Sequence, residues 1–127
     1  MYLDIDNFKD INDQWEHSFG DEVICAVANK LNNCSRTVDL LARLSGDEFA
    51  ILLEDMASKQ EILDIAKRYL TMFSEPLQID NTTIQATLSI GIALYPEHGA
   101  TAQAILQHAD EAMYLAKKQG KNQIVLS

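Results

Sequence analysis

The sequence predicts an α+β fold of the ferredoxin-like type, in which helices cover a central sheet. Three observations support this prediction. Strand and helix patterns begin in the order βαββαβ, and a further strand, helix and strand follow. The chain has 127 residues, which is the size of one domain. Its 47% content of apolar residues is sufficient for a buried core without disulfides. We therefore expect a single domain over residues 1–127.

The first third of the chain predicts a strand and a helical region. Residues 1–6 form an apolar strand pattern, and residues 8–15 predict a short helix. A loop is expected at 17–20, before a helix over 21–31. Three apolar side chains spaced i, i+3 and i+7 give that helix one buried stripe: Ile24, Val27 and Leu31.

A hairpin and a capped helix follow. Two short apolar runs, 40–44 and 49–53, flank the polar tip 45–48, which predicts a hairpin. Ser58 and Glu61 form a capping box at the start of the next helix, and Pro76 ends it.

The last third predicts a second hairpin, a helix and a closing strand. Residues 77–79 and 83–95 flank the turn 80–82, and the second of these strands alternates as if half buried. Thr101 caps a helix that runs through Gln119, and a strand over 123–126 closes the fold.

Charge and composition exclude several classes of function. Acids outnumber bases 19 to 10, for a net charge of −9, so binding to nucleic acid or to an anionic membrane surface is not expected. No run is long and apolar enough to span a bilayer. The two cysteines show no metal-ligand spacing, which fits a reducing, cytoplasmic location. Because the chain opens inside a strand pattern, we expect an N-terminally truncated fragment of a longer parent, and a membrane anchor in that parent is compatible with this expectation.

Two acidic clusters are the first candidates for chemistry. Asp4 and Asp6 lie on one face of an otherwise apolar strand, which suggests a Mg²⁺ site; the alternative is a strand that ends in solvent. Asp47 and Glu48 lie at the hairpin tip, where acids also serve turn geometry alone. In a ferredoxin-like sheet the first strand is central and pairs with this hairpin. The two clusters could therefore converge on a two-metal site for phosphoryl transfer.

Several cations offer phosphate contacts. Lys9, Lys117, Lys118 and Lys121 could hold phosphate oxygens beside such a site, although lysines near a helix C-terminus also complement the helix dipole. Asp21 is at a helix start, where an acid is commonly a cap, and His17 is more often a surface residue than a ligand.

Four motifs occur in order along the chain. They are DIDNFKDIND at residues 4–13, followed by His17, Gly20 and Asp21; RLSGDEF at 43–49; SIGIA at 89–93; and ADEAMYLAK at 109–117, followed by Gly120 and Asn122. Together they resemble the GGDEF domain of the diguanylate cyclase family over the whole chain. The resemblance implies a fold like the palm of nucleotidyl cyclases, with an added hairpin.

The resemblance also implies a reaction. Two GTP molecules, one on each domain of a homodimer, would condense to cyclic di-GMP and pyrophosphate. Asp4, the Ile5 carbonyl and Asp47 would hold Mg²⁺ (or Mn²⁺), with Asp47 also acting as the base and Glu48 supporting the metal site. The nucleotide contacts that it implies fall into two groups. Asn12, Asp21 and His17 would lie at guanine, and Phe8, Lys9, Lys117 and Lys121 at the phosphates. An upstream sensor domain in the parent is also implied.

Arg36 and Asp39 match the family's product-inhibition motif, in which they would bind cyclic di-GMP; Asp39 could also be a turn residue. Three positions depart from the family pattern. Ser45 replaces a glycine and would be strained if its φ were positive. Glu16 also replaces a glycine, and Lys121 replaces the commoner arginine.

Two other functions remain open on the sequence. One is a catalytically weak GGDEF domain that senses GTP or cyclic di-GMP, a reading favoured by Ser45 and Glu16. The other, which sets the resemblance aside, is a metal-dependent phosphohydrolase.

Overall fold

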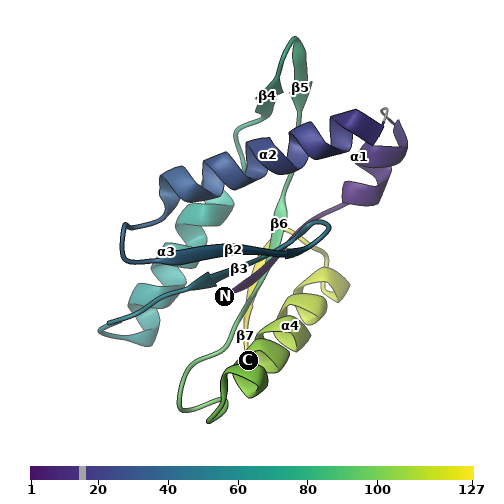
Figure 1. Cartoon of the computed structure of the whole chain (residues 1–127). Coiled ribbons are helices and arrows are strands. Elements are labelled where there is room, and N and C mark those ends of the chain that lie inside the picture. Colours follow the sequence, from purple (N-terminus) through teal and green to yellow (C-terminus); the bar gives the residue numbers. More distant parts are fainter. Residues whose placement is uncertain (15–16) are drawn as a thin grey trace.

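A computed structural model describes residues 1–14 and 17–127 and confirms the α+β class (Figure 1). A five-stranded sheet in the order β2-β3-β1-β6-β7 lies at its centre. The strands are β1 (Tyr2–Ile5), β2 (Leu40–Ser45), β3 (Glu48–Leu52), β6 (Leu88–Ile92) and β7 (Gln123–Leu126). The first four pair antiparallel in the ferredoxin-like order, and β7 adds to the edge parallel to β6. The predicted central position of β1 is therefore confirmed.

The helices pack on both faces of this sheet. They are α1 (Phe8–Gln14), α2 (His17–Cys34), α3 (Lys59–Met72) and α4 (Ala102–Lys118). Figure 1 shows α2 and α3 on one face and α4 on the other. All five residues of β6 are buried as a result, so the predicted half-buried alternation is wrong. A half-buried strand has one face in water, whereas α4 covers the second face of the sheet at β6.

Gly91 allows α4 to approach β6 closely. A Cβ at this position would overlap the Ala109 carbonyl oxygen and the Met113 backbone nitrogen, both on α4. The helix backbone therefore rests directly on the strand. This contact fixes the height of α4 above the sheet, and with it the position of Lys117 in the last helical turn.

The start of α2 differs from the prediction. The expected loop at 17–20 belongs to the helix, which begins at His17 and runs to Cys34. Gly20 lies inside this helix, where its missing side chain leaves room for Asn12 of α1; a Cβ there would overlap the Asn12 side-chain oxygen. A glycine that resembles a loop residue in the sequence thus serves the packing of two helices.

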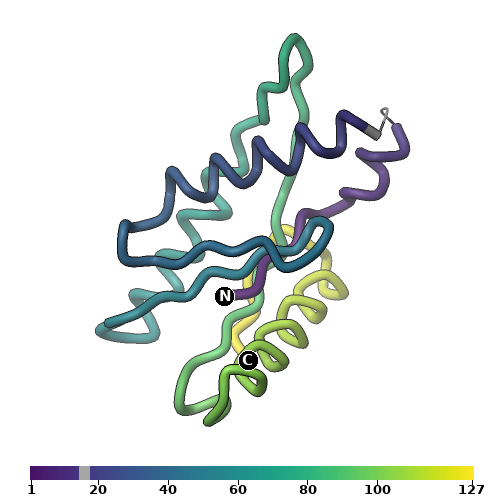
Figure 2. Tube along the Cα trace, in the orientation of Figure 1, coloured from purple at the N-terminus to yellow at the C-terminus, as the bar shows by residue number. Residues whose placement is uncertain are grey.

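The second predicted hairpin is shorter than expected. β4 (Leu77–Ile79) and β5 (Thr82–Ile84) form a separate two-stranded sheet that projects past α2 in Figure 1. The predicted single strand over 83–95 is wrong, because the chain leaves this hairpin after Ile84 and enters the main sheet at Leu88, as the trace in Figure 2 shows. None of the described helices is long and apolar enough to cross a bilayer.

Both predicted N-caps are confirmed. Ser58 accepts a hydrogen bond from the backbone N–H of Glu61, and Thr101 accepts one from that of Ala104. Glu61 in turn accepts from the backbone N–H of Ala57. The starts of α3 and α4 are therefore set by local side-chain contacts that the sequence already indicates.

Candidate functional site

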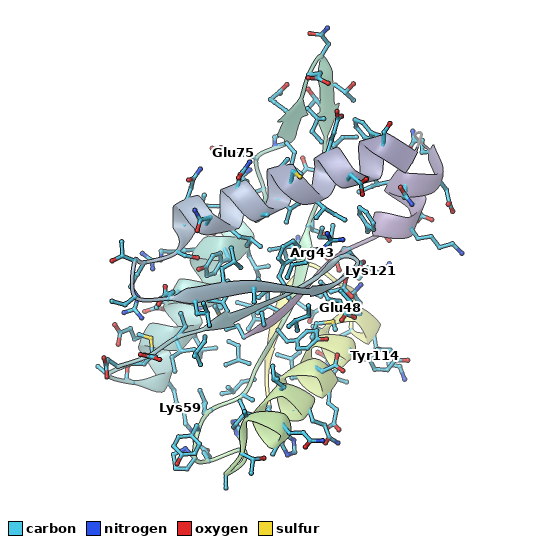
Figure 3. The ribbon with its side chains drawn as sticks, viewed as in Figure 1. Arg43, Glu48, Lys59, Glu75, Tyr114 and Lys121 are labelled. Carbon is cyan, nitrogen blue, oxygen red and sulfur yellow. The ribbon has the colours of Figure 1, made fainter. Side chains whose placement is uncertain are left out.

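The end of β1 and the tip of the β2–β3 hairpin meet at one edge of the sheet. The Ile5 backbone N–H donates to the Asp47 carbonyl oxygen at 3.1 Å, and Asp4 lies opposite Glu48 in the β1–β3 pairing. The two acidic clusters separated in the sequence are thus brought together, as the topology predicts. In Figure 3 the labelled Glu48 and Lys121 lie near each other, close to the labelled Arg43.

The hairpin turn places Asp47 without strain at Ser45. Gly46 has φ +44°, a conformation that favours glycine, whereas Ser45 ends β2 outside the positive-φ region. The β2–β3 register shifts between Arg43 and Ser45, and Arg43 Nε donates a hydrogen bond to the Gly46 carbonyl oxygen at 2.9 Å. The backbone strain that a positive φ would cause at Ser45 is therefore absent.

Asp4 is a buried carboxylate with one unused oxygen. Its Oδ2 pairs with Lys117 Nζ at 2.9 Å, while its Oδ1 is buried without a hydrogen-bond partner. Burial and the facing Asp47 carboxyl raise the pKa of Asp4 to about 7, against the opposing effect of Lys117. A second cation at Oδ1 would therefore stabilise the ionised form of Asp4.

This raised pKa predicts that Asp4 destabilises the domain above neutral pH when no cation is bound. An unfolded aspartate titrates near 3.9, so the contribution of Asp4 to stability is complete below about pH 4 and lost as the pH rises through 7. In the presence of a metal chelator, Asp4→Asn should raise the free energy of unfolding at pH 8 by about 1–2 kcal/mol, after allowance for solvent screening. At pH 4 the same substitution should change the free energy of unfolding little.

Urea unfolding at the two pH values measures this effect, with Asp10→Asn, an exposed acid on α1, as the matched control. Stabilisation of equal size at both pH values, or a loss of stability at pH 8, would contradict the assignment.

Glu48 is held by two hydroxyl groups. Tyr2 Oη donates to Glu48 Oε2 at 2.6 Å, and Ser45 Oγ donates to the same oxygen at 3.3 Å. Burial and Glu48 raise the pKa of Tyr2; burial, Glu48 and Glu111 raise that of Asp110 on α4. Sequence reasoning missed both residues. Tyr2 carried a signal, because its alternation with Asp4 along β1 places it on the acidic face.

Of the predicted nucleotide residues, Lys117 contacts the acidic edge directly, and the others lie on α1, on α2 or in the turn after α4. Lys117 is on the last turn of α4, and exposed Lys121 follows it with its Nζ donating to Asn7 Oδ1 at 2.6 Å. Half-buried Phe8 and exposed Lys9 open α1, directly after β1. Asn12 packs on Gly20, beside exposed Asp21. His17 begins α2, and its side chain and Glu16 lie outside the described residues.

Asp6 does not join Asp4 at the acidic edge. Both of its oxygens accept hydrogen bonds, from Ser89 Oγ, from Thr87 Oγ1 and from the Asn122 backbone N–H. The suggestion that Asp4 and Asp6 bind a cation together is therefore wrong, because both Asp6 oxygens already accept hydrogen bonds from three protein donors.

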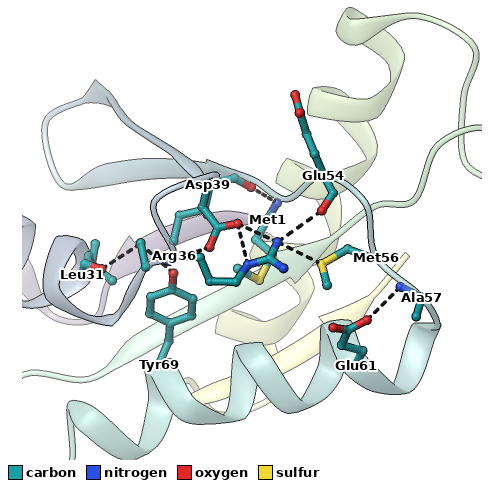
Figure 4. Close-up of polar contacts among 11 residues, drawn as sticks. Met1, Leu31, Arg36, Asp39, Glu54, Met56, Ala57, Glu61 and Tyr69 are labelled. Carbon is teal, nitrogen blue, oxygen red and sulfur yellow. Dashed lines mark hydrogen bonds and ion pairs between the residues drawn. The ribbon is translucent and has the colours of Figure 1, made fainter.

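Arg36 and Asp39 form a closed pair away from this edge (Figure 4). Arg36 Nε and Nη2 donate to Asp39 Oδ1 at 3.0 and 2.8 Å, and the Arg36 N–H donates to Oδ2 at 2.9 Å. Burial opposes ionisation of Asp39, but these hydrogen bonds outweigh it and lower its pKa. The Asp39 side chain is 1% exposed and that of Arg36 34% exposed, so only Arg36 offers surface to a ligand in this conformation.

The acidic edge fits a magnesium ion that is completed by a phosphate ligand. No three His, Cys, Asp or Glu side chains among residues 1–14 and 17–127 group closely enough to hold an ion alone. Mg²⁺, however, commonly takes one or two carboxylates and fills its remaining positions with water and substrate phosphates. The unpartnered Oδ1 of Asp4, with Asp47 beside it, supplies that donor set.

The ferredoxin-like sheet thus carries acids at the end of its central strand and at the neighbouring hairpin tip, with Lys117 and Lys121 nearby. The model of the family described as "Diguanylate cyclase, GGDEF domain" matches residues 1–123, and the chain belongs to this family.

Two curated relatives and one solved structure illustrate the similarity. The chain is 44% identical to diguanylate cyclase TpbB of Pseudomonas aeruginosa over 122 residues, which cover 95% of this chain and 28% of TpbB. It is 42% identical to cyclic di-GMP phosphodiesterase PdeR of Escherichia coli K12, over 97% of this chain and 18% of PdeR. The crystal structure of the TpbB GGDEF domain matches with a TM-score of 0.96 at 42% identity, over 99% of this chain and 79% of that one. The chain thus spans less than a third of the length of these curated relatives.

Proposed function

We propose that this chain is the catalytic domain of a diguanylate cyclase, which joins two GTP molecules into cyclic di-GMP with release of pyrophosphate. The observation that carries the proposal is the buried, unpartnered Oδ1 of Asp4 next to Asp47, with Lys117 already at the other oxygen. Phosphoryl transfer requires mainly positioning and neutralisation of charge, and this edge supplies acids for a cation and lysines for phosphate.

Asp4, the Ile5 carbonyl and Asp47 would hold Mg²⁺ (or Mn²⁺), which when bound neutralises charge on the phosphates and polarises them toward attack. Asp47 would also accept the proton of the attacking 3′-hydroxyl. Glu48, fixed by Tyr2, would support the carboxylate cluster. Lys117 would exchange its contact with Asp4 for a phosphate oxygen, because a cation at Asp4 repels its ammonium group.

Residues of α1, of α2 and of the turn after α4 would make the remaining contacts with the nucleotide. Phe8, Lys9 and Lys121 would line the β- and γ-phosphates, while Asn12 and Asp21 would pair with the guanine edge, near His17. A carboxylate opposite N1–H and N2–H₂ selects guanine, because adenine would leave the acid without donors. Each domain holds one GTP, so both 3′-hydroxyls reach an α-phosphate only when two domains face each other.

A second candidate function is a domain that binds GTP or cyclic di-GMP without turnover. It is favoured by the 42% identity to PdeR, whose name gives it phosphodiesterase activity. A dimerised form of the chain incubated with GTP and Mg²⁺ separates the two, since only the cyclase releases cyclic di-GMP and pyrophosphate.

We further propose that Arg36 binds the product. Its guanidinium is held in place by the buried Asp39 and by the Glu54 carbonyl at 3.2 Å, and its side chain is 34% exposed, so it remains accessible to phosphate or guanine. For Asp39 to contact guanine as well, the pair would have to open.

Arg36→Ala should weaken cyclic di-GMP binding by at least about 1.5 kcal/mol, the value of one charge-assisted hydrogen bond, and leave GTP binding nearly unchanged. Arg36→Lys keeps the charge but loses the two-pronged geometry, so it should recover only part of the affinity. Calorimetry with both ligands, on variants shown to be folded by thermal melting, measures this. Equal product affinity in parent and Arg36→Ala would reduce the pair to a structural turn.

A further inference from the structure

Asp6 is a buried carboxylate that the proposed reaction does not use. It is 2% exposed, and its Oδ1 accepts from Ser89 Oγ at 2.6 Å. Its Oδ2 accepts from Thr87 Oγ1 at 2.7 Å and from the Asn122 backbone N–H at 3.0 Å. The first two donors belong to the start of β6 and the residues before it. The third belongs to a different part of the chain, the turn between α4 and β7.

That turn has an unusual backbone. Gly120, Lys121 and Asn122 have successive φ values of +126°, +64° and +47°, and two of the three carry side chains that disfavour this region. The Lys121 N–H donates back to the carbonyl oxygen of Ala116, on the last turns of α4, at 3.1 Å. Residues in this backbone region need stabilising contacts from the surrounding structure. The hydrogen bond from the Asn122 N–H to the Asp6 carboxylate is one such contact.

The neighbouring residue makes a parallel contact. Asn7 Oδ1 accepts from Lys121 Nζ at 2.6 Å, and Asn7 itself has φ +57°. Two successive residues after β1 therefore hold two successive residues after α4. Because α1 begins at Phe8, these contacts join the turn that leads into Lys9 to the turn that carries Lys121.

We propose that Asp6 is a positioning residue for the triphosphate pocket, and that it acts through the Asn122 backbone to place Lys121. This inference rests on the proposed function, which gives Lys121 a phosphate contact. Loss of the Asp6 carboxylate frees the Asn122 N–H, releases the left-handed turn and lets the Lys121 ammonium move away from the β1–α1 turn.

The test compares binding of GTP and GMP, both with Mg²⁺, in four proteins: the parent chain, Asp6→Ala, Asp6→Asn and Ser89→Ala. Asp6→Ala should weaken GTP binding at least tenfold and GMP binding less than twofold, because GMP lacks the phosphates that Lys121 would contact. Asp6→Asn should stay within threefold for GTP. Its amide oxygen can still accept from Asn122, and its NH₂ group can donate to Ser89 Oγ.

Ser89→Ala is the matched control, since it removes a donor from the same buried carboxylate without touching the turn. It should leave GTP affinity within twofold even where it lowers the melting temperature. Should Asp6→Ala fail to fold, Asp6→Ser replaces it, because serine restores a polar group but is too short to reach Asn122.

Equal losses for GTP and GMP, or the same loss in Ser89→Ala, would reduce Asp6 to a structural residue and overturn the inference. Amide hydrogen exchange at Asn122 tests the contact without nucleotide, and it should be faster in Asp6→Ala than in Ser89→Ala. Unchanged exchange would overturn the inference alone, whereas a parent chain that does not bind GTP would overturn the proposed function.

Discussion

Asp47→Asn should reduce cyclic di-GMP synthesis in a dimeric form of the chain by at least about a thousandfold while leaving the fold intact. The residue lies in the two-residue loop of the β2–β3 hairpin, between Gly46 and Glu48. Its backbone carbonyl, which accepts from the Ile5 N–H, is unchanged by the substitution. The side chain alone loses its charge, and with it both the cation contact and the proton acceptor that we assign to it.

Initial rates of product formation measure the effect, together with thermal melting to confirm the fold. Asp80→Asn is the matched control, since Asp80 is an exposed acid at the β4–β5 turn and its positive φ suits asparagine. Synthesis at the parent's rate by Asp47→Asn would show that Asp47 is neither the catalytic base nor a required cation ligand.

Gly91→Ala should have the largest effect on stability, a loss of about 3 kcal/mol or more. The new methyl group would overlap backbone atoms of Ala109 and Met113, and backbone cannot move aside as a flexible side chain can. The helix must therefore lift from β6, which exposes core and displaces Lys117 from Asp4.

Urea unfolding of the isolated chain measures this loss. Gly46→Ala is the comparison, because a Cβ there meets open space and only the positive φ opposes it, at a cost of about 1 kcal/mol. Equal losses of stability in the two variants would contradict the claim that the close contact between α4 and β6 requires glycine at position 91.

The sequence predicts the element order, the central position of β1 and the meeting of the two acidic clusters, because periodicity and topology determine which residues reach the same edge. It does not predict the burial of β6 on both faces. That burial follows from α4 packing on Gly91, a contact between segments that single-strand alternation cannot represent. The helical Gly20 is a similar case, since its reason lies in Asn12 on another helix.

The roles of Asp4 and Asp6 show the same limit within one strand end. Their spacing is that of two ligands on one face, and the sequence offers no sign that one oxygen of Asp4 stays free while Asp6 is filled by three donors. The difference depends on Ser89, Thr87 and Asn122, which lie more than 80 residues away along the chain. Residue type likewise predicts strain at Ser45, but the positive φ of this turn falls on Gly46 instead.

The most direct measurement of the central proposal is the identity of the product that the chain forms from GTP and Mg²⁺, analysed by mass spectrometry over a range of protein concentrations. The account predicts cyclic di-GMP and pyrophosphate, with a rate per domain that rises with concentration as two active sites are brought face to face, and that becomes independent of concentration when a coiled coil joins the domains. Formation of GDP and phosphate, or no turnover in the joined dimer, would contradict it.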